Sequence, residues 1–196
     1  MRDWTVENRP KHSFRAKIGG AGFTLIEMLI TIAIAAILMG IAIPSFRYIT
    51  NSNRIASELN GLLGDLQLAR SEAIKEGRTI TVCQSNDGLV CSYTTNWQGG
   101  WIVFSDPTNV GVYDAGEVYI RKQKQFSGTD TFVASNNVSV ITFNREGYAV
   151  GMANGTLLTL HDSGNNSAWT RCLSINLSGQ MMSEIAGTIT NGVTCT

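Results

Sequence analysis

An almost uninterrupted apolar run extends from Phe23 to Ile43. It reads FTLIEMLITIAIAAILMGIAI, and only four residues interrupt its aliphatic and aromatic side chains: Thr24, Glu27, Thr31 and Gly40. A helix needs about 20 mainly apolar residues to cross the hydrocarbon core of a bilayer. The run therefore predicts one transmembrane helix over residues 23–43.

Glu27 is the one charged residue in this run. A charged side chain in hydrocarbon costs about 2.5–3.5 kcal/mol even on mild insertion scales, so a carboxylate at this position requires a partner. Its place near the start of the helix leaves a second interpretation, in which the side chain reaches the membrane surface.

A second hydrophobic pattern follows Pro44, where a helix would kink or end. Apolar residues recur at spacings of three and four, as on one face of an amphipathic helix: Ile55, Leu59, Leu62, Leu63, Leu66, Ala69 and Ala73. Charged residues fall mostly between them and predict a solvated outer face: Arg54, Glu58, Asp65, Arg70, Glu72 and Glu76. We therefore predict one helix from Phe23 to about Lys75, with a transmembrane half (23–43) and an amphipathic half (44–76).

From Arg78 onward, short segments rich in β-branched and aromatic residues alternate with turn sequences such as Asn86-Asp87-Gly88. The predicted strands are 79–84, 100–105, 117–121, 138–143, 156–161 and 171–177. Short strands at this spacing indicate an antiparallel sheet or sandwich, and the amphipathic helix would cover one of its faces. The predicted fold class is α+β, with a long N-terminal helix packed on an antiparallel β-sheet domain over residues 77–196.

Charge is distributed unevenly along the 196 residues, although the formal net charge is zero. Residues 1–22 carry five basic and two acidic side chains, so the remainder has a formal net charge of −3. Basic residues favour the cytoplasmic end of a membrane helix, so we expect a cytoplasmic N-terminus and an external C-terminal domain. Residues 1–22 contain no apolar segment of their own, which is unlike an ordinary secretory signal peptide.

All four cysteines lie in the predicted outer domain: Cys83, Cys91, Cys172 and Cys195. An even number in an exported domain suggests two disulfides, and four cysteines allow three connectivities. Closeness in the sequence favours Cys83–Cys91 and Cys172–Cys195, whereas four reduced thiols would need a reducing compartment. Trp97, Trp101 and Tyr93 are expected to pack around the Cys83–Cys91 loop.

The junction Gly22-Phe23-Thr24-Leu25-Ile26-Glu27 resembles the type IV prepilin class, which includes the pseudopilins of type II secretion. A basic leader ends in glycine, phenylalanine follows, and glutamate is the fifth residue after the junction. The later segments VCQSNDGLVCSYTTNWQGGWIVFSD, DAGEVYIR, ITFNREGYA and CLSINLSGQ resemble the GspH/FimT family of minor pilins and pseudopilins. The resemblance covers residues 15–182.

This resemblance implies that a prepilin peptidase removes residues 1–22 as a leader, by cutting between Gly22 and Phe23, and methylates the new amino group of Phe23. The mature protein would cross the inner membrane once, with its domain in the periplasm, and would then join a filament whose core is a bundle of helices 23–43. Its expected partners are the peptidase, membrane lipid, other minor and major pilins or pseudopilins, and the inner-membrane assembly platform.

The resemblance also gives Glu27 a partner. In a filament, its carboxylate would pair with the Phe23 amine of a neighbouring subunit and set the register between subunits. We predict a minor type IV pilin of the FimT/FimU kind, which helps to initiate or cap filaments. The minor pseudopilin H of type II secretion is the alternative, since both have the same leader, helix and domain.

Neither enzymatic activity nor a cofactor or metal is predicted. His161 is the only histidine outside the leader, and the sequence has no G-x-S-x-G segment or phosphate-binding loop. The loop Ser105–Glu117 offers oxygen atoms from Asp106, Asn109 and Asp114 as well as Glu117, but without the spacing of an EF-hand. A polar hairpin loop is therefore favoured over a calcium site.

DNA uptake is a less favoured alternative. Some FimT proteins bind DNA through a Gly-Arg-x-Arg motif near the C-terminus, and the corresponding residues here, Gly179-Gln180-Met181-Met182, contain no arginine. A second basic cluster, Arg121, Lys122 and Lys124, could contact phosphates weakly. Charged residues at the edge of a sheet also protect against aggregation, and this is the favoured role of the cluster.

Overall fold

The computed structural model describes residues 22–108, 110–190 and 192–196. The chain divides into two compact units, of which the first ends at Pro44 and the second comprises Ser45–Thr196. One helix, α1 (Leu25–Glu76), contributes to both units. The predicted long helix is therefore confirmed, and Pro44 lies inside it rather than at its end. The leader predicted over residues 1–22 lies outside the described residues except for Gly22.

The second part of α1 buries one face in the domain. Its buried residues are Ile55, Leu59, Leu62, Asp65, Leu66, Ala69 and Ala73. The apolar residues among them recur at spacings of three and four on one side of the helix, as predicted, while Leu63 is only partly buried. Gly77 ends the helix in the left-handed conformation, with a φ of 68°, and its N–H bonds the Ala73 carbonyl at 3.0 Å.

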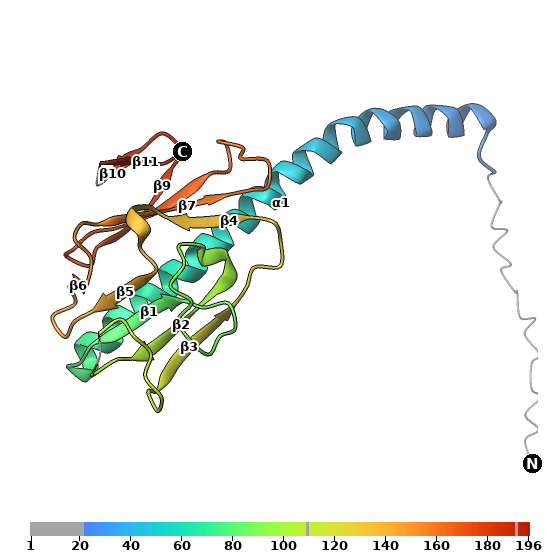
Figure 1. The fold of residues 1–196 in the computed structure, drawn as a ribbon. Helices are drawn as coiled ribbons and strands as arrows, with labels where there is room; N and C mark the ends of the chain where they lie inside the picture. The colour runs from blue at the N-terminus through green and yellow to red at the C-terminus, as the bar shows by residue number, and fades with distance from the viewer. Residues whose placement is uncertain (1–21, 109, 191) are drawn as a thin grey trace, which may run out of the picture. The chain divides into compact units, whose positions relative to one another are not determined.

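The strands form two antiparallel sheets and a short hairpin (Figure 1). The first sheet has the order β3-β2-β1-β5-β6, the second has the order β4-β7-β8-β9, and β10 pairs with β11. The strands are β1 (Ile80–Gln84), β2 (Gly100–Ser105), β3 (Tyr119–Lys124), β4 (Thr131–Ala134), β5 (Val140–Phe143), β6 (Ala149–Val150), β7 (Thr156–His161), β8 (Arg171–Ile175), β9 (Met181–Ile185), β10 (Ile189–Thr190) and β11 (Val193–Thr194).

Each of the six predicted strands overlaps a strand of the structure, and the predicted α+β class is confirmed. The sequence did not predict β4, β6 or β9–β11. These strands are short, and β9 reads MMSEI, which lacks alternation and contains a single β-branched residue. Its extended conformation comes from pairing with β8, in which Leu173 lies opposite Ser183.

One hydrophobic core joins α1 to both sheets. Val82, Trp101 and Ile141 face the helix from the first sheet, and Phe132 and Leu158 do so from the second. In Figure 1 the second part of α1 (teal) runs behind strands of both sheets. Burial of a large apolar side chain contributes about 1.5–3 kcal/mol, so this shared core accounts for most of what holds the domain together.

The other face of the first sheet is covered by loops. Cys83, Ile102 and Phe104 form a separate cluster there with Cys91 and partly buried tyrosines. The structure forms the disulfides Cys83–Cys91 and Cys172–Cys195, which is the connectivity that closeness in the sequence favours. The first disulfide fixes the loop after β1 across this face. The second attaches the C-terminal segment to β8.

The expected packing of aromatic residues around the Cys83–Cys91 loop is wrong for Trp97 and Trp101. Trp97 and Trp101 are fully buried in the core beneath α1, and Tyr93 is about half exposed. The reason is the alternation of side chains along β2, which sends Ile102 to the disulfide side and Trp101 to the helix side.

Asp65 is a further correction, since its predicted place was the solvated face of the helix. Its side chain is buried, with Leu62 and Leu66 on the same face. The indole Nε1 of Trp101 donates to one carboxylate oxygen at 2.8 Å, and Arg121 Nε donates to the other at 2.9 Å. Both partners are far away in the sequence, so local spacing alone could not identify them.

We predict that Asp65→Ala lowers the free energy of unfolding by about 2–3 kcal/mol, because it leaves the buried Trp101 N–H without an acceptor. Urea titration of the full chain in non-ionic detergent measures the change. Glu72→Ala, which removes a carboxylate paired with Lys75 on the same helix, is the matched control and should cost about 0.5 kcal/mol or less. Equal losses in the two variants would contradict the role assigned to Asp65.

Candidate processing and assembly site

The start of α1 carries the predicted processing site. Thr24 precedes the helix, and its hydroxyl oxygen accepts a hydrogen bond from the Glu27 N–H at 3.2 Å. Its carbonyl accepts the Met28 N–H, also at 3.2 Å. Thr24 is therefore the N-cap of the helix. Gly22 and Phe23 lie before the cap in non-helical backbone, which a protease can bind in an extended form.

The role of Thr24 was missed, although the sequence contains its signal. Thr24-Leu25-Ile26-Glu27 is a capping box, in which a threonine precedes a glutamate by three residues. The Glu27 carboxylate consequently lies in the first turn, where the positive end of the helix dipole favours an anion. The ion pairs among the described residues do not include Glu27, so its pairing with a neighbouring Phe23 amine stays a prediction.

The first part of α1 exposes its apolar side chains on all sides. Within the described residues it is the one helix long and apolar enough to cross a membrane, and none of its apolar window is buried. Leu25–Pro44 is about 20 residues of helix, roughly 30 Å, which matches the hydrocarbon thickness of a bilayer. The Thr31 hydroxyl donates to the Met28 carbonyl at 2.9 Å, so it needs no water partner.

At the other end of α1, Arg70 joins the helix to two turns of the domain. Its Nε donates to the Gly147 carbonyl at 2.9 Å and its Nη2 donates to the Ser178 carbonyl at 3.3 Å. The turns meet closely, since a Cβ added to Gly179 would lie 2.2 Å from the Gly147 carbonyl oxygen. Arg70, which was predicted on the solvated face, thus attaches the helix to the β5–β6 turn of the first sheet and the β8–β9 turn of the second.

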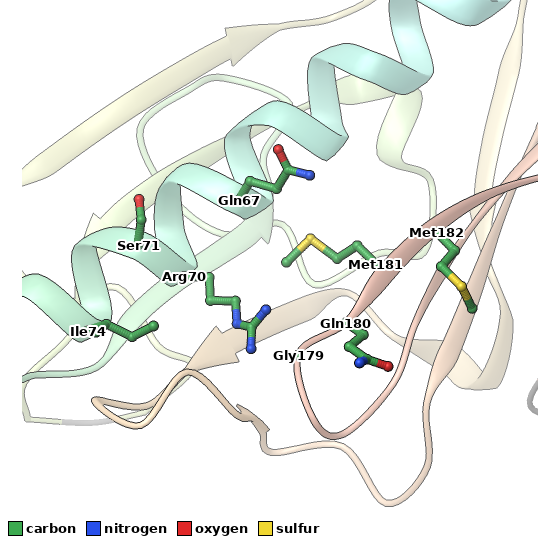
Figure 2. Close-up of a pocket in the computed structure, with 8 residues that line it drawn as sticks. All are labelled: Gln67, Arg70, Ser71, Ile74, Gly179, Gln180, Met181 and Met182. Carbon is green, nitrogen blue, oxygen red and sulfur yellow. The ribbon is translucent and has the colours of Figure 1, made fainter.

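A groove of about 740 Å³ lies beside this contact. Figure 2 shows Met181 extending toward α1 and Arg70 directed toward the turn at Gly179. This is the segment that corresponds to the DNA-binding motif of some FimT proteins. Here it brings methionine and glutamine side chains to the groove, and the guanidinium of Arg70 is engaged by backbone carbonyls.

The other candidate DNA-binding residues lie on β3, the edge strand of the first sheet, but not on one face. Arg121 pairs with Asp65 on the helix side. Lys122 lies 3.4 Å from the centre of the Tyr119 ring, and Lys124 shares its face of the strand. The structure therefore does not bring the three cations together on a single surface.

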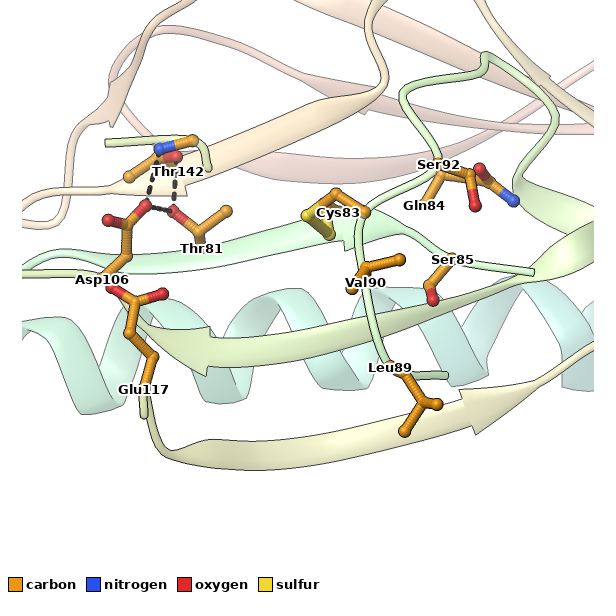
Figure 3. The surroundings of a disulfide bond; sticks show 12 residues. Thr81, Cys83, Gln84, Ser85, Leu89, Val90, Ser92, Asp106, Glu117 and Thr142 are labelled. Carbon is orange, nitrogen blue, oxygen red and sulfur yellow. Dashed lines mark hydrogen bonds between the residues drawn. A yellow bond between two sulfur atoms is a disulfide. The ribbon is translucent and has the colours of Figure 1, made fainter. Parts of the chain in front are cut away.

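The acidic loop before β3 is held by hydrogen bonds. The Asp106 Oδ2 atom accepts from the Thr81 hydroxyl and from the Gly111 N–H, each at 2.6 Å (Figure 3). Burial raises the pKa of Glu117, and the nearby charges of Asp106 and Asp114 act in the same direction. In the described part of the chain, no three His, Cys, Asp or Glu residues form a group suited to a metal ion.

His161 is the last residue of β7, and its Nδ1 lies 3.1 Å from the Thr170 hydroxyl. This hydroxyl also donates to the Asn166 carbonyl at 3.2 Å, so the histidine belongs to a polar turn. The interpretation of a strand-end histidine agrees with this position.

Comparison with known protein families assigns both parts of the chain. The model of the family described as type II transport protein GspH matches residues 58–179. The chain belongs to the GspH family. A second model, the prokaryotic N-terminal methylation motif, matches residues 20–43, which include Gly22, Phe23 and Glu27.

Solved structures with a similar fold include two crystal forms of the type IV minor pilin FimU from Pseudomonas aeruginosa. One is 24% identical with a TM-score of 0.56 and covers 69% of this chain and 92% of that chain. The other is 25% identical with a TM-score of 0.50 and covers 66% and 90%, respectively. The minor pseudopilin EpsH from the type 2 secretion system of Vibrio cholerae is 11% identical, with a TM-score of 0.48, over 67% of this chain and 97% of that chain. A search of curated proteins found no match.

Membership of the GspH family makes this protein a minor pilin or pseudopilin, which implies interaction with other pilins or pseudopilins. The exposed apolar part of α1 supports anchoring in a membrane. The GspH match begins in the second part of α1, at Glu58, and ends at the turn at Gly179. It therefore includes the last part of α1 with Arg70 and the strands β1–β8, but not β9 of the second sheet.

Proposed function

We propose that this GspH-family protein is a minor type IV pilin of the FimT/FimU kind, which helps to initiate or cap a pilus. The observation that carries the proposal is the arrangement at the N-terminal start of α1. There the non-helical junction Gly22-Phe23 is followed by a cap at Thr24 and then by an exposed apolar helix. The fold shared with FimU supports a filament subunit of this architecture.

The proposed sequence of events uses the same apolar surface twice. Before assembly, membrane lipid covers the helix over residues 23–43, with the basic N-terminus in the cytoplasm and the domain in the periplasm. A prepilin peptidase cuts between Gly22 and Phe23 and methylates the Phe23 amine. The assembly platform then extracts the subunit, and the helices of neighbouring pilins replace the lipid.

In this proposal the protein is a structural subunit and a substrate of the peptidase, and it has no catalytic role of its own. DNA binding is not part of the proposal. Arg121 is paired with Asp65, and the Gly179-Gln180-Met181-Met182 segment presents no cation to a phosphate. The domain instead supplies lateral contacts to other pilins through the outer face of α1 and its sheets.

The minor pseudopilin H of type II secretion is the second candidate, because the family description is that of a type II transport protein. Disruption of the gene separates the two functions. We expect loss of surface pili and of twitching motility, with normal export of secreted enzymes. Loss of enzyme export with intact pili would instead assign the protein to the type II secretion system.

We predict that the mature protein begins at Phe23 and carries a methyl group on its amine, because the junction lies ahead of the capped helix. Mass spectrometry of the N-terminal peptide from purified filaments measures both features. A filament-associated chain that still begins at Met1 would contradict the assignment as a processed pilin.

We predict that Glu27→Ala is cleaved normally but enters filaments at least about tenfold less, since a lost charge-assisted pair costs roughly 1.4 kcal/mol or more. Immunoblots of sheared filaments and of membranes measure the ratio. Glu27→Gln is the informative control, because it keeps a capping-box side chain without the charge. Normal incorporation of Glu27→Gln would assign the defect to the helix cap rather than to the ion pair.

A further inference from the structure

Arg54 on α1 forms a two-point contact with Asp130, which lies just before β4. Its Nε donates to Asp130 Oδ2 at 2.7 Å and its Nη2 donates to Oδ1 at 2.8 Å. The Asp130 side chain is fully buried, whereas that of Arg54 is 43% exposed. When both oxygens of a buried carboxylate accept hydrogen bonds from one guanidinium, the cost of burying the charge is well compensated. The Arg54–Asp130 pair alone would therefore be neutral, with no carboxylate oxygen left without a donor.

Glu58 adds a second carboxylate to this complete pair. It lies one turn after Arg54 on the helix, and both the charge of Asp130 and a hydrogen bond with it act on the pKa of Glu58. Its Oε2 atom is buried and receives no hydrogen bond from any donor among the described residues. Three charged groups would then carry a net charge of −1 in a partly buried site, which is costly unless a proton removes one of the charges.

The location of this cluster gives it a mechanical role. Ile55, between Arg54 and Glu58, is the first buried residue of α1. Asp130 lies on the connection from β3, an edge strand of the first sheet, to β4, an edge strand of the second. The cluster therefore fastens the point where the helix enters the core to the connection between the two sheets.

We propose that Glu58 and Asp130 share one proton in the folded protein, and that this proton fastens the first buried turn of α1 to the β3–β4 connection. With the proton present, the Glu58 carboxyl donates to the Asp130 carboxylate, which Arg54 also binds. When the proton passes to solvent, two carboxylates face each other across one guanidinium. Their repulsion then releases this end of the helix.

The pKa of Glu58 agrees with this arrangement. It is raised from 4.5 to about 7, first by burial and then by the charge and hydrogen bond of Asp130, while the charge of Arg54 opposes the rise. Arg54 and Asp130 are the charged groups that act on Glu58. His161, on the neighbouring β7, pairs in register with Thr131 and contacts the Thr170 hydroxyl instead.

The sign of the pH dependence follows from the direction of this shift. A carboxyl whose pKa is higher in the folded than in the unfolded protein stabilises the fold below its unfolded value, and the stabilisation is lost as the pH rises through the folded value. For Glu58 the contact is complete below pH 4.5 and is lost through about pH 7. A contact of Glu58 that weakened as the pH fell would have the opposite pH dependence.

Hydrogen exchange of the full chain in non-ionic detergent tests the proposal, with rates corrected for the intrinsic effect of pH. Protection of amides in the Arg54–Glu58 turn and next to Asp130 should fall by roughly tenfold from about pH 5.5 to about pH 8.5. This is smaller than the pKa shift alone would give, because Glu58 is partly exposed to solvent. Protection of the β1 amides should change much less.

Glu58→Gln is the decisive variant, since its neutral amide keeps the shape and the hydrogen-bond donor of the protonated acid. Its protection at these amides should be independent of pH and should exceed that of the unmodified protein at pH 8.5 by about tenfold. Glu72→Gln, another glutamate of α1, is the matched control and should keep the original pH dependence.

Infrared titration gives a second readout that a purely structural role would not change. The protonated carboxyl should produce a band that disappears through about pH 7, and the band should be missing in Glu58→Gln. An unmodified protein whose protection and infrared spectrum do not change with pH would overturn the proposal. So would a Glu58→Gln variant that keeps the original pH dependence. Neither result bears on filament membership, because both measurements use the isolated chain.

Discussion

The apolar side chains of Leu25–Pro44 cannot remain in contact with water. This constraint determines the surroundings in which the whole molecule can exist. Each large side chain left exposed forgoes about 1.5–3 kcal/mol of burial. The described chain has no other element that covers this part of α1, whose apolar window is entirely exposed. Lipid and other helices are the two surroundings that satisfy it. A subunit that passes from a membrane to a filament exchanges one for the other.

The second part of the same helix has the opposite requirement, since it must hold one orientation on a folded domain. Its alanines and leucines supply most of the burial energy, but apolar packing alone specifies direction weakly. Asp65 and Arg70 add that direction, because each reaches polar atoms at fixed places: the Trp101 indole N–H for Asp65, and the Gly147 and Ser178 carbonyls for Arg70. The helix therefore combines a uniform apolar surface at one end with specific polar contacts at the other.

Local patterns predicted the elements well and their contacts poorly. The spacing of Ile55 to Ala73 gave the buried face of α1, and alternation gave most strands. Asp65 and Arg70 were assigned to solvent, because a charge between apolar residues carries no sign of a partner on a distant strand or turn. The proximity of Glu58 to Asp130 was hidden for the same reason. Thr24 is different, since the capping box was present in the sequence and was overlooked.

The position of that cap relative to the junction has a consequence for the timing of maturation. Thr24 and Glu27, the two residues of the capping box, both lie on the Phe23 side of Gly22. A cut at this junction removes no hydrogen bond that defines the first turn, so the start of the helix is the same in the precursor and in the product. The cap of the helix is therefore complete before cleavage, and what cleavage adds is the charged amine of Phe23. That amine, rather than the first turn, is what maturation contributes to the proposed pairing with Glu27 of a neighbouring subunit.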